Sequence, residues 1–175
     1  MKLIIGIGAL FLMCAAASAQ ASNPTPPPEL KKLHVWVGNW ELSGKAQDQP
    51  NGPRYTLRWH LYEHWILDGF FLAVDQTWKG NGQVLHALEM LSYDTGKQVY
   101  TDSGFGSDGS TWSLTATFDN STMIESGSTR GSDGEITKCR TTWSFRRGGK
   151  SLSGTQECDK NGVRWRALDV TGTKS

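Results

Sequence analysis

The clearest pattern along the chain is an alternation of apolar and polar residues in short runs. In the segment RYTLRWHL, residues 54–61, every second side chain is apolar. Successive side chains of a β-strand point to opposite faces, so this two-residue period predicts a strand with one buried face. The segment 111–118 shows the same period, with Trp112 among its apolar positions. The apolar positions of the first segment are Tyr55, Leu57, Trp59 and Leu61.

Similar β-rich runs follow one another through most of the chain, separated by Gly, Asn and Asp residues that are typical of turns. The connections are short, so strands adjacent in sequence are expected to pair as antiparallel neighbours. About ten such strands predict an all-β, up-and-down barrel, because closing the sheet removes its two exposed edges. The predicted strands are 40–46, 54–61, 70–78, 84–93, 98–105, 111–118, 122–130, 136–146, 150–157 and 163–171.

The first 19 residues have the pattern of a secretory signal peptide. Lys2 is followed by an apolar run over residues 3–13, and the segment ends on the small residues of 17–19. The apolar run is shorter than the roughly 20 residues that span a bilayer, and no later segment approaches that length. We therefore expect an exported bacterial protein without a transmembrane segment, either periplasmic or secreted.

The rest of the chain is expected to form one domain. Residues 20–28 are rich in proline, which favours an extended linker, and residues 29–175 are then the barrel domain. A short helical turn is predicted over 29–36, ahead of the first strand.

The charge balance excludes some partners. Loss of residues 1–19 removes one of the 18 basic residues and leaves 17 basic against 17 acidic side chains. A net charge of zero argues against a nucleic-acid partner or an anionic membrane surface. The sequence does not indicate an oligomeric state.

A pair of cysteines is predicted to form a disulfide. If Gly148 and Gly149 form a two-residue turn, Cys139 and Cys158 each lie nine residues from it and face each other across two strands. An exported protein with an even number of cysteines favours a bond between them. The parity of the hairpin places the two cysteines at a hydrogen-bonded pair, where the backbones are about 5.5 Å apart.

A Gly-x-Trp triplet, Gly38 to Trp40, stands at the start of the first predicted strand. Together with LKKLHVWVGNWELSGKA, WILDGFFLAV, LSYDTGKQVYTDSGFGSDG and STWSLTATFD, in this order, it resembles a family of bacterial exported domains of unknown function in the calycin, or lipocalin-like, superfamily. The resemblance runs from about residue 30 to 170. It implies a calycin-like barrel in which Trp40 closes one end and Gly38 allows the chain to turn beneath it.

One motif looks like a metal site but is expected not to form one. HLYEH, residues 60–64, has the spelling of a zinc-protease motif, which requires a helix. On a strand, His60 and His64 lie about 13 Å apart, too far to share one zinc ion. We therefore expect no metal and no cofactor, and surface positions for both histidines.

The run VLHALEML is apolar in both phases and leaves two orientations open. Either His86, Leu88 and Met90 or Leu85, Ala87 and Glu89 face the lumen. His86 and Glu89 are the only candidates for an acid–base group, since a polar group in an apolar lumen has a perturbed pKa.

These observations lead to one preferred function and two alternatives. The preferred function is the binding of a small apolar or amphipathic molecule in the lumen, as calycin-type barrels of this size do. The alternatives are a hydrolase or isomerase with His86 or Glu89 as the acid–base group, and an envelope interaction or structural module with a packed lumen. The candidate ligand-binding residues are Trp59, His86, Met90 and Trp112.

Overall fold

A computed structural model describes residues 24–175 of the chain. The predicted signal peptide lies outside the described residues, so export stays a prediction. One 3-10 helix, η1 (Pro28–Val35), precedes the strands, and two single turns of 3-10 helix, η2 (Leu67–Gly69) and η3 (Arg147–Gly149), join strands. The strands are β1 (Gly38–Ala46), β2 (Tyr55–Ile66), β3 (Phe71–Gly80), β4 (Gln83–Asp94), β5 (Val99–Gly106), β6 (Thr111–Asp119), β7 (Thr122–Arg130), β8 (Ile136–Arg146), β9 (Ser151–Lys160) and β10 (Val163–Lys174).

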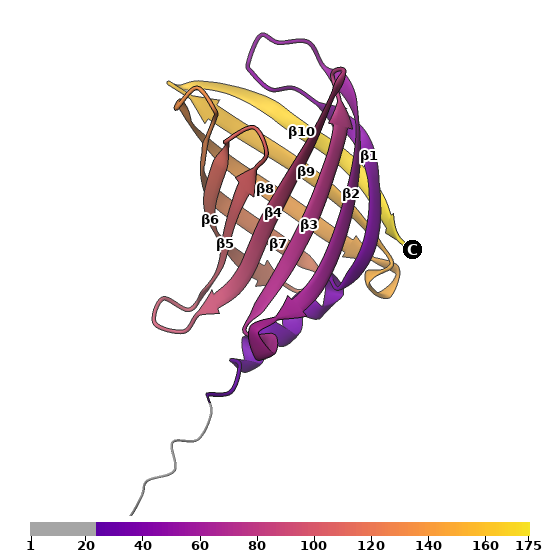
Figure 1. Cartoon of the computed structure of the whole chain (residues 1–175), viewed down its shortest axis with the longest axis vertical. Coiled ribbons are helices and arrows are strands. Elements are labelled where there is room, and N and C mark those ends of the chain that lie inside the picture. The colour runs from indigo at the N-terminus through magenta and orange to yellow at the C-terminus, as the bar shows by residue number, and fades with distance from the viewer. Residues whose placement is uncertain (1–23) are drawn as a thin grey trace, which may run out of the picture.

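The ten strands form a closed antiparallel barrel in which each strand pairs with its neighbours in sequence (Figure 1). Strand β10 returns to pair with β1, from Trp40 opposite Lys174 to Ala46 opposite Leu168, and this pairing closes the sheet. The predicted all-β, up-and-down barrel is therefore confirmed. The two-residue period made it readable, because every strand has one face in the interior and one in solvent.

One end of the barrel is closed by an aromatic plug. Helix η1 lies across this end (Figure 1) and inserts Leu30 and Leu33, which are fully or nearly fully buried. Trp36 follows the helix, and its ring packs edge to face on Trp40 and Phe145 at centroid distances of 6.1 and 4.7 Å. These side chains pack together at the η1 end of the barrel.

Trp40 and Gly38 lie at the start of β1, next to the plug. Trp40 is completely buried, and its Nε1 donates a hydrogen bond of 2.6 Å to the carbonyl oxygen of Trp36. Gly38 has φ of +124°, a conformation that side chains with a Cβ rarely adopt. Lys174 lies over the Trp40 ring at 4.9 Å and donates to the carbonyl oxygen of Val35, which ties the end of β10 to the plug.

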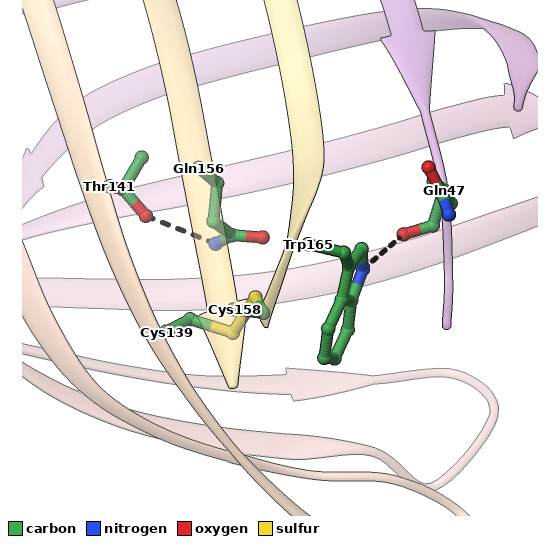
Figure 2. The surroundings of a disulfide bond; sticks show 6 residues. All are labelled: Gln47, Cys139, Thr141, Gln156, Cys158 and Trp165. Atoms are coloured by element: carbon green, nitrogen blue, oxygen red, sulfur yellow. Dashed lines mark hydrogen bonds between the residues drawn. A yellow bond between two sulfur atoms is a disulfide. The ribbon is translucent and has the colours of Figure 1, made fainter. Parts of the chain in front are cut away.

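The disulfide between Cys139 and Cys158 is present (Figure 2), as the sequence predicts. The two residues are directly opposite each other on β8 and β9. Their Cα atoms are 4.1 Å apart, near the roughly 4.5 Å of a non-hydrogen-bonded pair, so the predicted hydrogen-bonded pair is wrong. The connection spans residues 147–150 rather than two glycines, because the ladder ends at Arg146 and Ser151. A four-residue turn shifts the pattern of the ladder by one position, so pairs that a two-residue turn would make hydrogen-bonded become non-hydrogen-bonded, and the reverse.

No helix within residues 24–175 is long and apolar enough to cross a membrane.

Candidate functional site

The barrel encloses a cavity of about 520 Å³. Its floor is Trp36 of the plug, and its walls extend to the turns at the opposite end, where Asp48, Gln49, Asp133 and Glu135 line it. The end opposite η1 is therefore the mouth of the barrel. The cavity is lined by six tryptophans, which are Trp36, Trp59, Trp78, Trp112, Trp143 and Trp165.

The tryptophan rings form a connected aromatic wall. Trp59 contacts Trp78 and Trp143, with centroid distances of 5.4 and 5.8 Å, and Trp78 stacks on Trp112 at 6.4 Å. Aromatic rings at these separations attract one another through their edges and faces. A flat or apolar molecule in the cavity would contact ring surface on several sides.

Four carboxyl groups project into the same cavity, each from a different strand. Glu63, Asp102 and Glu125 are buried, and Glu89 is partly buried where it faces the cavity. They lie on the inward phase of β2, β5, β7 and β4 respectively. We call these four side chains the carboxyl ring.

Two strands position Glu89 through a short hydrogen-bond relay. Gln76 of β3 donates from Nε2 to Glu89 Oε2 at 2.5 Å, and its Oε1 accepts a bond of 2.9 Å from Trp78 Nε1. The indole N–H group of Trp78 can only donate a hydrogen bond, so the oxygen of the Gln76 amide must face it and the amide nitrogen faces Glu89. Glu89 therefore faces an amide donor rather than a cation.

Two further indoles hold the other acids. Trp112 Nε1 donates to Asp102 at 3.0 Å, and Trp143 Nε1 donates to Glu125 at 2.8 Å. Each indole lies flat across a glycine of the neighbouring strand, where a Cβ would come within 1.9 Å of the Trp112 ring at Gly104 and within 2.0 Å of the Trp143 ring at Gly154. A side chain at either glycine would occupy the space of the ring. Glycine at these positions therefore allows each indole to reach its acid.

Burial raises the pKa of every member of the carboxyl ring, because a charge is poorly solvated there. The pKa of Glu89 rises to about 8, through burial and the nearby charge of Glu125. Glu125 has a pKa of about 7, raised by burial and held down by its bonds to Trp143 and Asp102.

Two members of the carboxyl ring are more strongly perturbed. The pKa of Asp102 is well above its usual range, because of burial and the charges of Glu89 and Glu125. The pKa of Glu63 is also well above its usual range, through burial first and the charge of Glu89 second. The raised pKa values favour the protonated forms of the carboxyl ring.

One buried donor in the cavity has no partner. Trp59 is 8% exposed, and its Nε1 makes no hydrogen bond to any atom in residues 24–175. An unpaired buried N–H group costs about 1–3 kcal/mol, so such groups usually have a function or a partner. Trp59 is one of the residues that line the cavity, so this N–H group belongs to the cavity wall.

The structure separates the residues predicted from sequence into two groups. Trp59, Trp112 and Glu89 line the cavity. His86 is exposed, and its ring and backbone bond to Thr77 and Ser107 on the outside of the barrel. Met90 shares its phase, so the expectation that His86 and Met90 face the lumen is corrected: the Leu85, Ala87 and Glu89 phase is the inward one. The ligand-binding and catalytic roles themselves stay predictions.

Sequence reasoning missed three of the four members of the carboxyl ring. Glu63 continues the two-residue period of Trp59 and Leu61, because β2 runs on to Ile66 without a bulge. The same period places Asp102 inward after Tyr100, and Glu125 inward after Met123. The sequence therefore contained the signal for these three acids: each stands at a position that the two-residue period of its strand predicts to be buried.

The histidines of HLYEH lie on the outer wall, as expected from a strand. His60 is 3.8 Å from Glu41, and His64 is 3.9 Å from Asp75. Within the part of the chain that the structure describes, no three histidine, cysteine, aspartate or glutamate side chains converge closely enough to hold a metal ion.

These features define the class of the molecule as a closed ten-strand barrel with an internal, acid-lined cavity. The chain belongs to the family described as "Protein of unknown function (DUF1579)", whose model matches residues 25–162. Among solved structures it is similar to the crystal structure of Rv2717c from M. tuberculosis, with a TM-score of 0.61, 14% sequence identity, and coverage of 86% of this chain and 99% of that one. At this identity the likeness shows the fold. No curated protein matches the sequence.

Proposed function

We propose that the protein binds a small apolar or amphipathic molecule in the lumen of its barrel. The observation that carries this proposal is the cavity of about 520 Å³, which reaches the mouth and is walled by tryptophan rings. Ligand sites are concave, mostly apolar and carry a few oriented polar groups, with volumes of roughly 300–1,000 Å³. The Trp59 N–H group and the carboxyl ring are such polar groups.

The size of the cavity favours binding over the structural alternative. A lumen closed by its own side chains would leave only water-sized voids, because protein interiors are close-packed. The plug fills the η1 end in this way, but Trp36 borders the open cavity. A purely structural role would not require the remaining part of the barrel to stay open.

A binding experiment with a blocked lumen tests the proposal. Tryptophan fluorescence is titrated with a panel of lipids, quinones and porphyrins, and the best compound is repeated with Leu114→Trp. Leu114 lines the cavity, so the larger ring is expected to weaken binding by tenfold or more. The matched control is Thr115→Trp, because Thr115 is the next residue of β6 and faces solvent. A panel without any binding, or equal effects of the two variants, would contradict the proposal.

A second candidate function is acid–base catalysis by Glu89, and the raised pKa of about 8 favours it. A carboxyl group that stays protonated near neutral pH can donate a proton to a substrate and take one back. The partly buried Glu89 faces the cavity, as the sequence allowed. The enzyme would be a hydrolase or isomerase.

A pH–rate profile separates catalysis from binding. Turnover of a panel of chromogenic aryl esters is measured between pH 5 and 9 for the wild type and for Glu89→Gln. Catalysis by Glu89 predicts a limb near pH 8 that the variant lacks. Rates that match the buffer blank throughout remove the enzyme hypothesis for this substrate class and leave the binding proposal unaffected.

The same proposal includes the superfamily and the location. The plug beneath Trp40 and the ten-strand barrel support a calycin-like assignment. The disulfide supports an oxidising compartment, such as the periplasm or the cell exterior. Sequencing the N-terminus of the protein from the periplasmic fraction tests both cleavage and location, and recovery of the uncleaved chain from the cytoplasm would oppose export.

A further inference from the structure

The ionisable side chains that line the cavity are almost all acidic. Seven carboxyl side chains and one basic side chain, that of Lys160, line it within the described residues. Lys160 lies 3.6 Å from Glu135 at the mouth, so its charge is already paired. The seven acids are Asp48, Glu63, Glu89, Asp102, Glu125, Asp133 and Glu135.

The acids occupy two levels of the cavity. Asp48, Asp133 and Glu135 stand at the mouth, on or beside the turns that surround the opening. The carboxyl ring lies deeper, between the mouth and the plug. The acids at the mouth give the entrance one sign of charge, which concentrates ligands of the opposite sign there.

The tryptophans complete the surroundings that a cation requires. The faces of indole rings attract ammonium groups, and aromatic cages are a common way of binding organic cations. Here Trp59, Trp78 and Trp112 form one wall, and Trp78 is linked through Gln76 to Glu89. Bare metal ions fit less well, since no three acidic, histidine or cysteine side chains in residues 24–175 converge on one point.

The unpartnered Trp59 N–H group adds a second requirement. It is a donor, so the group that satisfies it must be an acceptor such as an ether, carbonyl or hydroxyl oxygen. A molecule that meets both requirements carries a positive charge at one end and an oxygen acceptor on an apolar body.

We propose that the ligand of this cavity is an organic cation, an amine on a flat or apolar body with an oxygen acceptor, whose ammonium group binds the carboxyl ring at Glu89. This proposal rests on the proposed function, because it names the chemical class of the molecule in the same lumen. The ammonium ion replaces a proton: Glu89 loses its proton on binding, and the proton leaves for the solvent.

The charged and titratable groups around Glu89 bear on this exchange. They come from four other strands, and the cation near them within residues 24–175 is Lys174, which lies beside Glu63 and is already bonded to the carbonyl oxygen of Val35. The neighbouring charges raise the pKa of Glu89, and a bound ammonium group would lower it. The facing groups are Glu63 of β2, Gln76 of β3, Asp102 of β5 and Glu125 of β7.

The test uses three probes that differ in charge but share one body. They are 5-methoxytryptamine, 5-methoxytryptophol and 5-methoxyindole-3-acetate, which carry a positive charge, no charge and a negative charge, and all have the same ether oxygen. Isothermal titration is expected to show the amine binding at least tenfold more tightly than the alcohol, and the acid not binding. Titrations in two buffers of different ionisation enthalpy are expected to show release of about one proton for the amine alone.

The pH dependence and one variant identify the residue. With Glu89 at a pKa of about 8, the affinity for the amine is expected to rise by one to two orders of magnitude from pH 6 to pH 8. Glu89→Gln keeps an acceptor for Gln76 and is expected to remove this rise and the proton release. Glu157→Gln, on the exposed face of β9, is the matched control.

The outcomes separate the two proposals. Equal or tighter binding of the alcohol or the acid overturns the organic-cation proposal and leaves lumen binding standing. Displacement of the amine by micromolar calcium points to a metal ion and overturns it as well. Failure of all three probes overturns the cation proposal, and failure of the lipid, quinone and porphyrin panel in addition overturns the proposed function.

Discussion

The carboxyl ring makes the stability of the barrel fall as the pH rises, and Glu89→Gln is the variant that isolates this effect. In the folded protein the pKa of Glu89 is about 8, against an ordinary value of 4.5. A raised pKa in the folded state means that the unfolded chain loses its proton first. The contribution of Glu89 to stability is therefore complete below about pH 4.5 and is lost as the pH rises towards 8.

The magnitude follows from the pKa shift. One pKa unit corresponds to about 1.4 kcal/mol, so between pH 5 and pH 8 the free energy of unfolding is expected to fall by about 3–4 kcal/mol through Glu89 alone. This figure is an upper value, because the cavity is open to water, which solvates the charged carboxylate. Glu125 and Asp102 add to the fall in the same direction, since the pKa of each is also raised.

Urea unfolding followed by far-UV circular dichroism at pH 5, 6, 7 and 8 measures the effect. Glu89→Gln is isosteric and keeps an oxygen to accept from Gln76, so it is expected to reduce the fall by 2–3 kcal/mol and to be more stable than the wild type at pH 8. Glu157→Gln, on the outer wall, is expected to leave the slope unchanged. An equal slope for the wild type and Glu89→Gln would refute the assignment of a raised pKa to the lumen acid.

Two further predictions concern the walls of the cavity. Gly104→Ala places a methyl group within 1.9 Å of the present Trp112 ring position, so the indole must move and lose its bond to Asp102. We expect urea unfolding to show a loss of stability of about 1–3 kcal/mol. The control, Ser103→Ala on the outer face of β5, is expected to cost little. Removing the disulfide by Cys139→Ala and Cys158→Ala is expected to cost about 3 kcal/mol, because the bond closes a loop with a sequence separation of 19. Intact mass before and after reduction with alkylation checks that the bond is formed, and a mass without the two-hydrogen difference would contradict it.

The fold was readable from the sequence because an up-and-down barrel is specified locally. The two-residue period within each segment predicts a strand, and the turn residues between segments predict a connection. An example is Asn161 and Gly162 between β9 and β10. No long-range information is needed to order the strands when neighbours in sequence pair. The match of Cys139 to Cys158 shows that even the register of one hairpin followed from counting.

The candidate site was harder to predict from the sequence than the fold, because it depends on which face of each strand points into the barrel. In β4 both phases are apolar, and the true orientation is set by the partners on β3 and β5, where Val74 and Gly104 flank Glu89. The relay from Trp78 to Glu89 and the two indoles that lie across glycines join residues on different strands. Such contacts exist only after the sheet has closed, so composition and spacing within one strand do not reveal them.

The central claim is that a small molecule occupies the lumen between the tryptophan wall and the carboxyl ring. A crystal structure of the protein grown with the tightest-binding compound from the titrations tests it directly. We predict electron density for one molecule inside the barrel, in contact with Trp59 and Trp112 and within hydrogen-bonding distance of Glu89. Density for the compound on the outer wall alone, or a lumen filled by rearranged side chains, would contradict the account.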